Sequence, residues 1–405
     1  MEAPPRAAAG PRRRYVYLAI LALVGFVTSF GAHIVATNLP SYAETVGVGA
    51  LMIGLLIGVY DFAELFAKPV SGFIADRRGM KLTLLAGLGI FIAGSLLFLV
   101  IDPRLLLLVR FVQGLGAAAL STVSITMVAK YFADARGRAF GIYNAIKGAG
   151  YVIAPALGGF LAHAYGFGSI FVVSASVGVL ALLLALFLPR ERKAGEELED
   201  DDDDLSLKQF LAIFRDPVLR PVYAVILINM FLVGILFGFL PVYLHGIGYT
   251  AVASGSVVSV ATFSYLLVQP AAGYLADRAP MRVTVVAGLL AASAAICLVT
   301  FTRGLPLLGL AILAGLGIGT VWTNSDAMVG ALVEENRLGA GMGAAQSFKE
   351  LGDMVGPVLI GLLTQLFGVR AAFVACGTIA LIALLMLSRS PAFRAVRPSR
   401  AGSTG

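Results

Sequence analysis

Three ionisable side chains lie close together in a stretch that is otherwise apolar, YDFAELFAKP at residues 60–69. Asp61, Glu64 and Lys68 follow one another at spacings of i, i+3 and i+7, so they share one face of a helix, within an arc of about 60°. Apolar surroundings favour the protonated form of a carboxyl group, whereas an approaching cation favours the ionised form. These residue types at this spacing could therefore exchange a proton, form an ion pair or bind a charged ligand.

The elements that position these charges are apolar helices. Of the 405 residues, 59% are hydrophobic and 13% are charged, whereas a soluble domain has about 25% charged residues. A membrane-spanning helix needs about 20 consecutive, mostly apolar residues. The chain is therefore expected to be an all-α, multi-pass membrane protein. Twelve such runs are predicted, at residues 15–43, 49–75, 82–101, 105–129, 140–163, 169–188, 220–243, 251–276, 283–302, 307–331, 340–366 and 370–388.

Basic residues gather in alternate gaps between these runs. Because positively charged loops stay on the cytoplasmic side, both termini are expected to be cytoplasmic, in the inner (plasma) membrane. Topology thereby explains the formal net charge of +7, and nucleic acid is not expected as a partner. The basic segments are RRR at 12–14, DRRGMK at 76–81, KYFADARGR at 130–138, PRERK at 189–193, DRAPMR at 277–282 and the segment from Arg389 onward.

A segment of different composition separates the first six runs from the last six. Residues 189–219 contain the acidic run EELEDDDDD at 196–204, which is typical of a solvated linker. Apolar residues then recur at i, i+3, i+4 and i+7 over 207–214 behind Ser206, which predicts an amphipathic helix on the inner membrane surface. The expected organisation is a tail (1–14), a six-helix bundle (15–188), this linker (189–219), a second six-helix bundle (220–388) and a tail (389–405).

An internal repeat relates the two bundles. GFIADRRGMKLTLLAGL at 72–88 aligns with GYLADRAPMRVTVVAGL at 273–289, at a constant offset of 201. With six spans each, both halves start on the same side of the membrane, so the two repeats are parallel. The second half lacks the charges of the first, which the fold therefore does not require. At the positions of Asp61, Glu64, Lys68 and Arg110 the second half has Thr262, Tyr265, Gln269 and Ala311.

Three interpretations of the charges remain open: ion pairs that hold helices together, a carboxylate that changes protonation during transport, and direct binding of a charged substrate. Arg110 is predicted to be the mobile counter-charge of Asp61 and Glu64. At 1.5 Å per residue it lies about 7–8 Å below the outer end of its run and Asp61 about 18 Å below that of its own, so they would meet only through water or in one conformation. The other expected charge partners are Lys68, Lys147, Lys349, Glu350 and Asp353.

The segment after the second run resembles the signature loop of the major facilitator superfamily. It reads GFIADRRGMK at 72–81, and the resemblance extends over essentially the whole chain after the N-terminal tail. It implies a major facilitator fold, with the substrate path between the two bundles. The cytoplasmic gate that this loop holds in the family would fall on Gly72, Asp76, Arg77, Gly79 and Lys81.

Two further motifs resemble proton-linked members of that superfamily. The fourth run reads LLLVRFVQGLGAAA at 106–119, which matches a motif whose arginine, here Arg110, is tied to proton transfer in the family. The fifth reads GYVIAPALGG at 150–159, which is similar to the antiporter motif, with Ala154 in place of a glycine. The drug:proton antiporter branch is the closest resemblance. The antiporter-like residues are Gly150, Pro155, Gly158 and Gly159.

Several isolated polar or aromatic residues inside the runs are candidates for lining a substrate cavity. Each could instead form a hydrogen bond between helices. The chain's only tryptophan is among them, and it lies deep in a run rather than in an interfacial belt. These residues are His33, Asn38, Gln113, Asn144, Trp322, Asn324 and Asp326.

Signatures of enzymes and of ATP binding are missing from the sequence, which has neither a GxxxxGK[ST] loop nor a GxSxG or HExxH motif. No cofactor or metal is expected, and the chain is not expected to be an enzyme. It is expected to act as a monomer. The predicted function is secondary active transport by alternating access, with proton-coupled export of a small amphipathic or hydrophobic compound. The alternatives are a lipid or lysolipid translocator on the same fold and a non-transporting membrane sensor.

Overall fold

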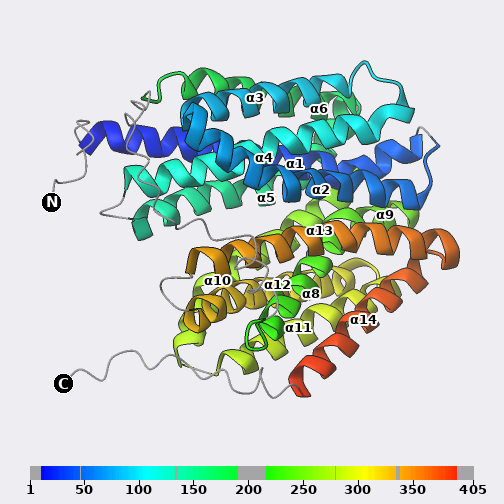
Figure 1. Cartoon of the computed structure of the whole chain (residues 1–405). Coiled ribbons are helices and arrows are strands. Elements are labelled where there is room, and N and C mark those ends of the chain that lie inside the picture. Colours follow the sequence, from blue (N-terminus) through cyan, green and yellow to red (C-terminus); the bar gives the residue numbers. More distant parts are fainter. Residues whose placement is uncertain are drawn as a thin grey trace, which may run out of the picture. The chain divides into compact units, whose positions relative to one another are not determined.

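The computed structural model describes residues 11–45, 47–132, 136–189, 216–278, 280–333 and 338–389. Within these ranges the regular structure is helical (Figure 1). The amphipathic helix expected at 207–214 and the acidic run at 196–204 lie outside the described residues. The helices of the first half of the chain are α1 (Pro11–Thr45), α2 (Ala50–Arg78), α3 (Met80–Leu97), α4 (Leu106–Tyr131), α5 (Arg136–Tyr165) and α6 (Gly168–Ala185). Those of the second half are α8 (Arg220–Gly238), α9 (Leu240–Gly246), α10 (Ala251–Arg278), α11 (Met281–Leu298), α12 (Gly304–Leu332), α13 (Leu338–Phe367) and α14 (Val369–Arg389).

Within the described ranges, twelve helical segments are long and apolar enough to cross a membrane. The prediction of an all-α protein with twelve spans is therefore confirmed. The seventh span, Arg220–Gly246, consists of α8 and α9, which are separated at Phe239. Pro241 lies in the first turn of α9, where its missing N–H is tolerated, and a proline cannot continue the hydrogen bonding of the helix before it.

The helices cluster into two compact units, and each is described by itself. The first unit contains residues 1–38 and 62–194, and the second contains residues 39–61 and 195–405. The division falls inside α2, whose first half packs on α13 within the second unit. A Cβ atom added to Gly54 would lie 2.2 Å from the carbonyl oxygen of Pro357, so the two backbones are in direct contact. The bundle boundaries expected from the sequence, 15–188 and 220–388, stay a prediction.

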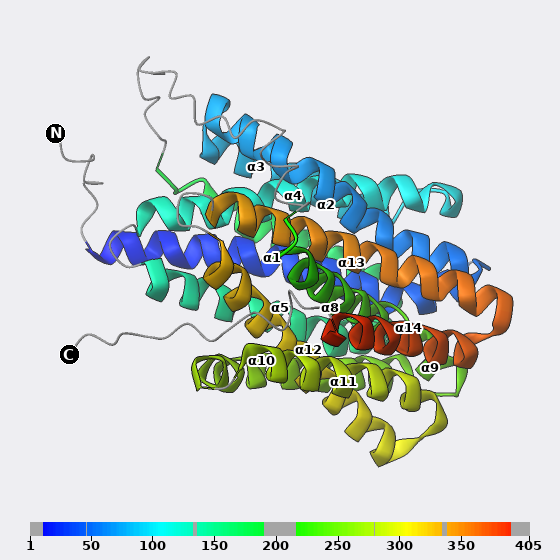
Figure 2. The same ribbon diagram turned by 60° about the horizontal axis from the view of Figure 1, so that its bottom comes forward.

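Equivalent helices pack in the same way in the two units. In the first, α3 packs on α4 and α6, and in the second α11 packs on α12 and α14 (Figures 1 and 2). The α3–α4 crossing and the equivalent α11–α12 crossing are both close, because in each a glycine faces the backbone of the neighbouring helix. A Cβ atom on Gly116 would lie 2.9 Å from the Gly87 carbonyl oxygen, and one on Gly317 would lie 2.5 Å from the Gly288 carbonyl oxygen. The repeat in the sequence is thus also a repeat of helix packing.

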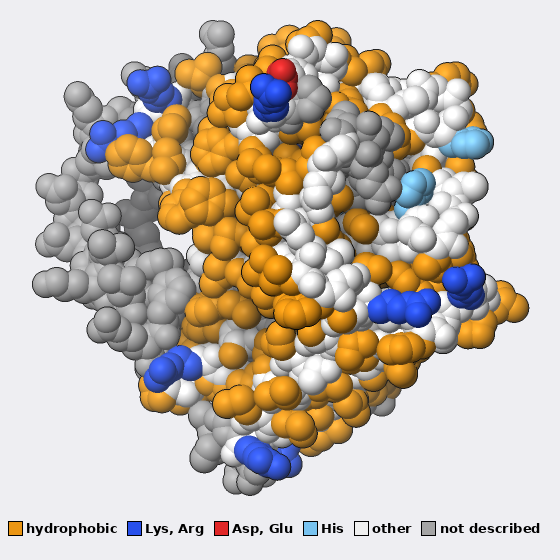
Figure 3. All heavy atoms as spheres, turned by 90° about the vertical axis from the view of Figure 1, so that its right-hand side faces the viewer, with side chains coloured by type: hydrophobic (Ala, Val, Ile, Leu, Met, Phe, Trp, Pro, Cys, Tyr) orange, Lys and Arg blue, Asp and Glu red, His pale blue; other side chains and the backbone are white. Residues whose placement is uncertain are grey.

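Large apolar side chains are exposed along the outer faces of the helices. Phe66, Phe160 and Leu267 are about half to two-thirds exposed, at 60%, 49% and 64%. Figure 3 shows one face of the molecule, on which apolar side chains are widespread and charged side chains are few and isolated. Soluble monomers rarely expose so much contiguous apolar surface, whereas lipid-facing helices do so as a rule. The exposed surface therefore agrees with twelve spans in a bilayer.

Candidate functional site

Glu64 and Lys68 form an ion pair in the middle of α2. The Nζ atom of Lys68 lies 2.5 Å from Oε2 of Glu64, as the i, i+4 spacing allows. Glu64 is buried, with 8% of its surface exposed, and Lys68 is partly exposed. Asp61, one turn earlier, is partly buried and takes part in interactions of its own. The predicted pairing within this charged face is therefore present, and one of its carboxylates is held inside the first unit.

Arg110 is held inside the first unit by a chain of hydrogen bonds. Its Nη1 atom donates to Oε1 of Gln113 at 2.6 Å and its Nη2 atom to the carbonyl oxygen of Ala32 at 3.2 Å. Gln113 then donates to Oγ of Ser95 at 3.0 Å, and Ser95 lies 3.4 Å from Oγ of Ser174. The chain joins α1, α4, α3 and α6, and Arg110 is only 1% exposed. A role for Arg110 as counter-charge of the α2 carboxylates stays a prediction.

The antiporter-like residues bring α5 against α1. A Cβ atom on Gly150 would lie 2.4 Å from Oγ of Ser29, and one on Gly158 would lie 2.2 Å from Nδ2 of Asn38. The hydroxyl group of Ser29 also donates to the carbonyl oxygen of Lys147 at 2.6 Å. Pro155 lies inside the same helix, and Gly159 is buried. The motif therefore permits close contact between two helices.

The loop at 72–81, which resembles the signature loop of the superfamily, contains residue types that its local structure calls for. Gly79, between α2 and α3, has φ +98°, which favours glycine. Lys81 donates to the carbonyl oxygens of Leu186, at 2.6 Å, and Leu188, at the end of α6, where a cation is favourable. The Arg77 guanidinium lies 4.2 Å above the ring centroid of Phe73. Gly72 is partly buried, and the side chain of Asp76 is not described.

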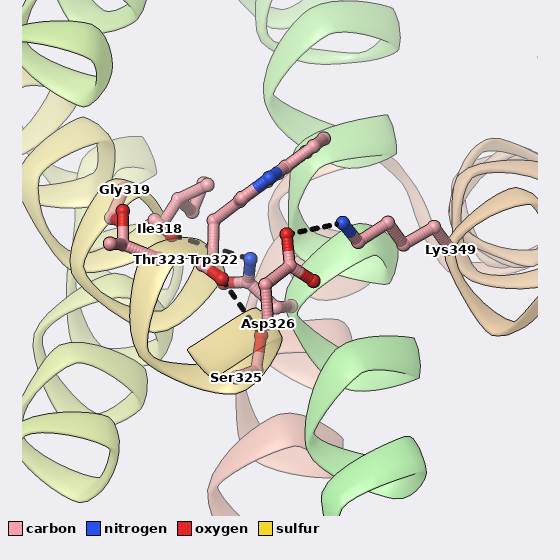
Figure 4. Close-up of polar contacts among 8 residues, drawn as sticks. Ile318, Gly319, Trp322, Thr323, Ser325, Asp326 and Lys349 are labelled. Carbon is pink, nitrogen blue, oxygen red and sulfur yellow. Dashed lines mark hydrogen bonds and ion pairs between the residues drawn. The ribbon is translucent and has the colours of Figure 1, made fainter. Parts of the chain in front are cut away.

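A second ion pair lies in the second unit, between α12 and α13. The Nζ atom of Lys349 lies 2.7 Å from Oδ2 of Asp326, as drawn in Figure 4. The same Nζ atom lies 4.5 Å from the ring centroid of Trp322, and the Trp322 ring meets Tyr265 edge-on at 5.6 Å. Sequence reasoning placed Asp326 and Trp322 among cavity residues and Lys349 among the partners of α2. The structure instead brings these three residues together.

Two of the other polar candidates, Asn324 and Asn38, are buried asparagines that form hydrogen bonds within their unit. Asn324 is fully buried; it accepts a hydrogen bond from Thr284 of α11 at 2.8 Å and donates to the carbonyl oxygen of Thr320 at 2.8 Å. Asn38 donates to the Ile34 carbonyl oxygen at 2.8 Å. The Asn324 bond joins α11 to α12, which fits the alternative of hydrogen bonding between helices, whereas the Asn38 bond stays within α1. A cavity-lining role for either asparagine stays a prediction.

Two candidates have surroundings of a different kind. His33 contacts the carbonyl oxygen of Ser29 at 2.8 Å and meets the ring of Tyr151 edge-on at 4.4 Å. Asn144 is exposed on α5. Glu350 and Asp353 on α13 are partly buried and take part in interactions. Among the described residues, no three His, Cys, Asp or Glu side chains lie together as metal ligands would.

The profile of the Major Facilitator Superfamily matches residues 21–302 and 247–404, which together take in nearly the whole chain. The chain belongs to the Major Facilitator Superfamily. Among its relatives is the multidrug resistance protein MdtG of Citrobacter koseri, which is 26% identical over 369 residues, covering 86% of this chain and 88% of MdtG. MdtG of Escherichia coli SMS-3-5 is 25% identical over 376 residues, covering 87% and 89% of the two chains.

Solved structures of major facilitator transporters share this fold. A bacterial homologue of the human lysosomal transporter Spinster, in an inward-facing and unoccupied conformation, matches with a TM-score of 0.82 at 18% identity, covering 97% of this chain and 100% of that one. The D-xylose–proton symporter matches with a TM-score of 0.77 at 13% identity, covering 94% and 98%. The predicted superfamily is therefore confirmed, and this major facilitator protein is a secondary transporter and a multi-pass membrane protein, not an enzyme.

Sequence reasoning did not identify every residue of the polar clusters in this major facilitator protein. Ser95 and Ser174 extend the Arg110 chain, and Tyr265 forms one wall beside Trp322. The two serines could have been identified from the sequence, because a polar side chain in a spanning helix needs a hydrogen-bond partner inside the bundle. The Tyr265 position carries no such signal, because an aromatic residue in a span is ordinary.

Proposed function

We propose that this major facilitator protein exports small amphipathic or hydrophobic compounds in exchange for protons. The observation that carries export is the similarity to proteins named multidrug resistance protein MdtG, which extends over 86% of this chain and 88% of the relative. The antiporter-like glycines of α5 agree with this proposal. The sequence GYVIAPALGG at 150–159 resembles the antiporter motif of the drug:proton antiporter branch, and its glycines pack closely against α1.

The Glu64–Lys68 pair supports coupling to protons. The pair lies in the interior of a spanning helix, where a charge costs about 2.5–3.5 kcal/mol on the insertion scale. Protonation of Glu64 would remove its attraction to Lys68 and change the preferred position of both side chains. A protonation step could thus be linked to a conformational step, as alternating access with proton exchange requires.

The proposal includes the orientation of the protein in the membrane and its oligomeric state. Basic gaps between the spans favour cytoplasmic termini in the inner membrane, and the exporter is proposed to act as a monomer. Labelling of single cysteines placed at residues 102 and 303 tests the orientation, since both gaps would face outward. Modification by a membrane-impermeant reagent in intact cells is expected at these two positions. Protection of both would reverse the assigned topology.

Proteoliposomes with an internal pH indicator provide the direct test of exchange. Purified protein is reconstituted, and a panel containing a cationic, a neutral and an anionic amphiphile and a lysolipid is added without an imposed gradient. At least one amphiphile is expected to produce a pH change that empty liposomes lack. Transport of amphiphiles with no proton movement would overturn coupling, and transport of the lysolipid alone would favour the lipid translocator over a drug exporter.

A further inference from the structure

The ammonium group of Lys349 already makes the two contacts that an organic cation makes in an aromatic site. Its Nζ atom lies 2.7 Å from Oδ2 of Asp326 and 4.5 Å from the ring centroid of Trp322. Attraction of a cation to the face of an indole ring within about 6 Å is significant, above all when water is excluded. Lys349 is almost fully buried, at 5% exposed, so both contacts are made with little water present.

A second aromatic side chain borders this pair. The ring of Tyr265 meets that of Trp322 edge-on, with the two ring centroids 5.6 Å apart, and the two rings form an aromatic corner. A cation at Asp326 would therefore have a carboxylate and an aromatic corner beside it.

The carboxylate of Asp326 is partly accessible, and one of its two oxygens is free to accept a further hydrogen bond. Its side chain is 28% exposed, so a ligand from outside the bundle can reach it. Its Oδ1 atom is buried and has no hydrogen-bond partner within the described part of the chain. Figure 4 shows Lys349 reaching from α13 to this carboxylate, which lies beside Trp322 on α12. The flexible four-carbon stem lets the ammonium group leave the carboxylate without a movement of the backbone.

The packing of the fold does not call for this arrangement. At the offset of 201, Trp322 corresponds to Ser121 and Asp326 to Ile125 in α4, although α4 and α12 pack in equivalent ways. An ion pair that served only to join helices would be expected where the packing needs it, in both halves. The second half therefore carries a feature of its own, made of an aromatic corner, a carboxylate and a displaceable cation.

We propose that Trp322, Tyr265 and Asp326 form a binding site for lipophilic organic cations, in which Lys349 is a built-in competitor. An incoming cation takes the place of the lysine ammonium group on Asp326 and against the indole ring, and the lysine returns when the cation leaves. This inference rests on the proposed export function and names the substrate class that it would carry. Lys349 keeps the carboxylate neutralised in the empty site and sets how tightly a cation must bind to enter.

The single tryptophan of the chain makes the site directly observable. Tetraphenylphosphonium and tetraphenylborate have the same shape and opposite charge, and each is titrated into the full-length protein in detergent while Trp322 emission is recorded. Saturable quenching or a spectral shift is expected with the cation and not with the anion. Equal responses to both ions, or a response to the anion only, would overturn a cation site and point to an apolar or an anion-binding surface.

Two substitutions are expected to act in opposite directions. Asp326→Asn removes the carboxylate and should abolish saturable binding of the cation. Lys349→Met removes the competitor, and if the lysine occupies the site 90–99% of the time, the Kd for the cation should fall by about 10–100-fold. Lys349→Gln, which can still donate a hydrogen bond to Asp326, should also lower the Kd and replaces the Met variant if that variant does not fold. An unchanged or higher Kd in the folded Lys349 variant would overturn the proposal.

A control removes a lysine to which no role is assigned. Lys130→Met takes away one positive charge at the exposed end of α4, in the first unit, and it should leave the Kd measured at Trp322 unchanged. An equal tightening in Lys130→Met would mean that net charge and not a displaceable ligand controls binding. The binding assay needs no gradient, so failure of proton exchange with intact cation binding would refute only the proposed coupling. Export of neutral compounds without cation binding would refute only this site.

Discussion

The two halves of this transporter share a packing scaffold and differ in the polar chemistry that the scaffold holds. Gly116 packs against the Gly87 backbone in the first half, and Gly317 packs against the Gly288 backbone in the second. These two pairs are related by the offset of 201 residues. Small residues let spanning helices approach closely, which is a main source of their association in lipid. The crossings are therefore held in the same way in both halves.

The residues between these crossings differ in polarity. The charged and polar chain of Arg110, Gln113 and Ser95 is buried in the first half, and the corresponding positions of the second half are buried as well. They are occupied there by Ala311, Ala314 and Ile296. Because the same crossing forms with three apolar residues, packing alone does not explain a buried guanidinium group. A functional role for the charges stays a prediction, and the two halves serve as controls for each other.

The largest effect is expected from Arg110→Met. This substitution removes the cation and leaves Oε1 of Gln113 without its donor at 2.6 Å, which costs about 1–3 kcal/mol for a buried group. Gradient-driven transport should be abolished, and the Tm should fall. Transport in proteoliposomes and thermal unfolding in detergent measure the two effects.

A double variant separates those effects. Arg110→Met with Gln113→Leu makes both partners apolar at similar volume, as in the second half, and such a change can be nearly neutral for stability. The double variant should recover most of the lost Tm and none of the transport. Wild-type transport by the double variant would show that the buried cation has no part in the cycle.

The next effect in size is expected from Glu64→Gln, which keeps the shape and removes the charge that pairs with Lys68. Transport against a gradient should be lost, whereas exchange of substrate down its gradient should remain, because only coupling is removed. Accumulation with and without a proton gradient measures this difference. Asp102→Asn is the control: this exposed carboxylate accepts a hydrogen bond from the backbone N–H of Arg104 at 2.8 Å, and the variant should retain accumulation. Full accumulation by Glu64→Gln would exclude Glu64 as the coupling group.

A third prediction concerns the shared scaffold. Gly150→Ala in α5 and Gly352→Ala in α13 each place a methyl group against a neighbouring helix, 2.8 Å from Phe30 N and 2.5 Å from the Leu227 carbonyl oxygen. Each should destabilise the protein to a similar extent, by about 1–3 kcal/mol. Gly309→Ala, where an added Cβ has no neighbour within 4 Å, should be neutral or slightly stabilising. A large loss of Tm in only one of the two halves would contradict equivalent packing.

The features that could be predicted from the sequence are those that depend on local helix geometry and on the internal repeat. Twelve spans follow from apolar runs, and the Glu64–Lys68 pair follows from its i, i+4 spacing within one helix. The pairing of Lys349 with Asp326 joins two helices, and the rotation of each helix about its axis decides whether such residues face each other. Periodicity leaves that rotation open in a helix that is apolar all round. For the same reason, the sequence did not show that Ser95 and Ser174 belong to the hydrogen-bonded chain of Arg110.

The smallest effect is expected from Thr284→Val in α11. Thr284 donates to Oδ1 of the buried Asn324 at 2.8 Å, and side-chain hydrogen bonds between spanning helices contribute about 0.6 kcal/mol on average. Thr83, at the same position of the repeat, donates instead to the Gly79 carbonyl oxygen at 3.1 Å, so Thr83→Val leaves no side-chain acceptor without its donor. Thr284→Val should therefore lower the Tm slightly more than Thr83→Val, with transport unchanged in both. The reverse order would mean that the Asn324 cluster does not stabilise the second half, and that its polarity, like that of Asp326, has to be explained by transport.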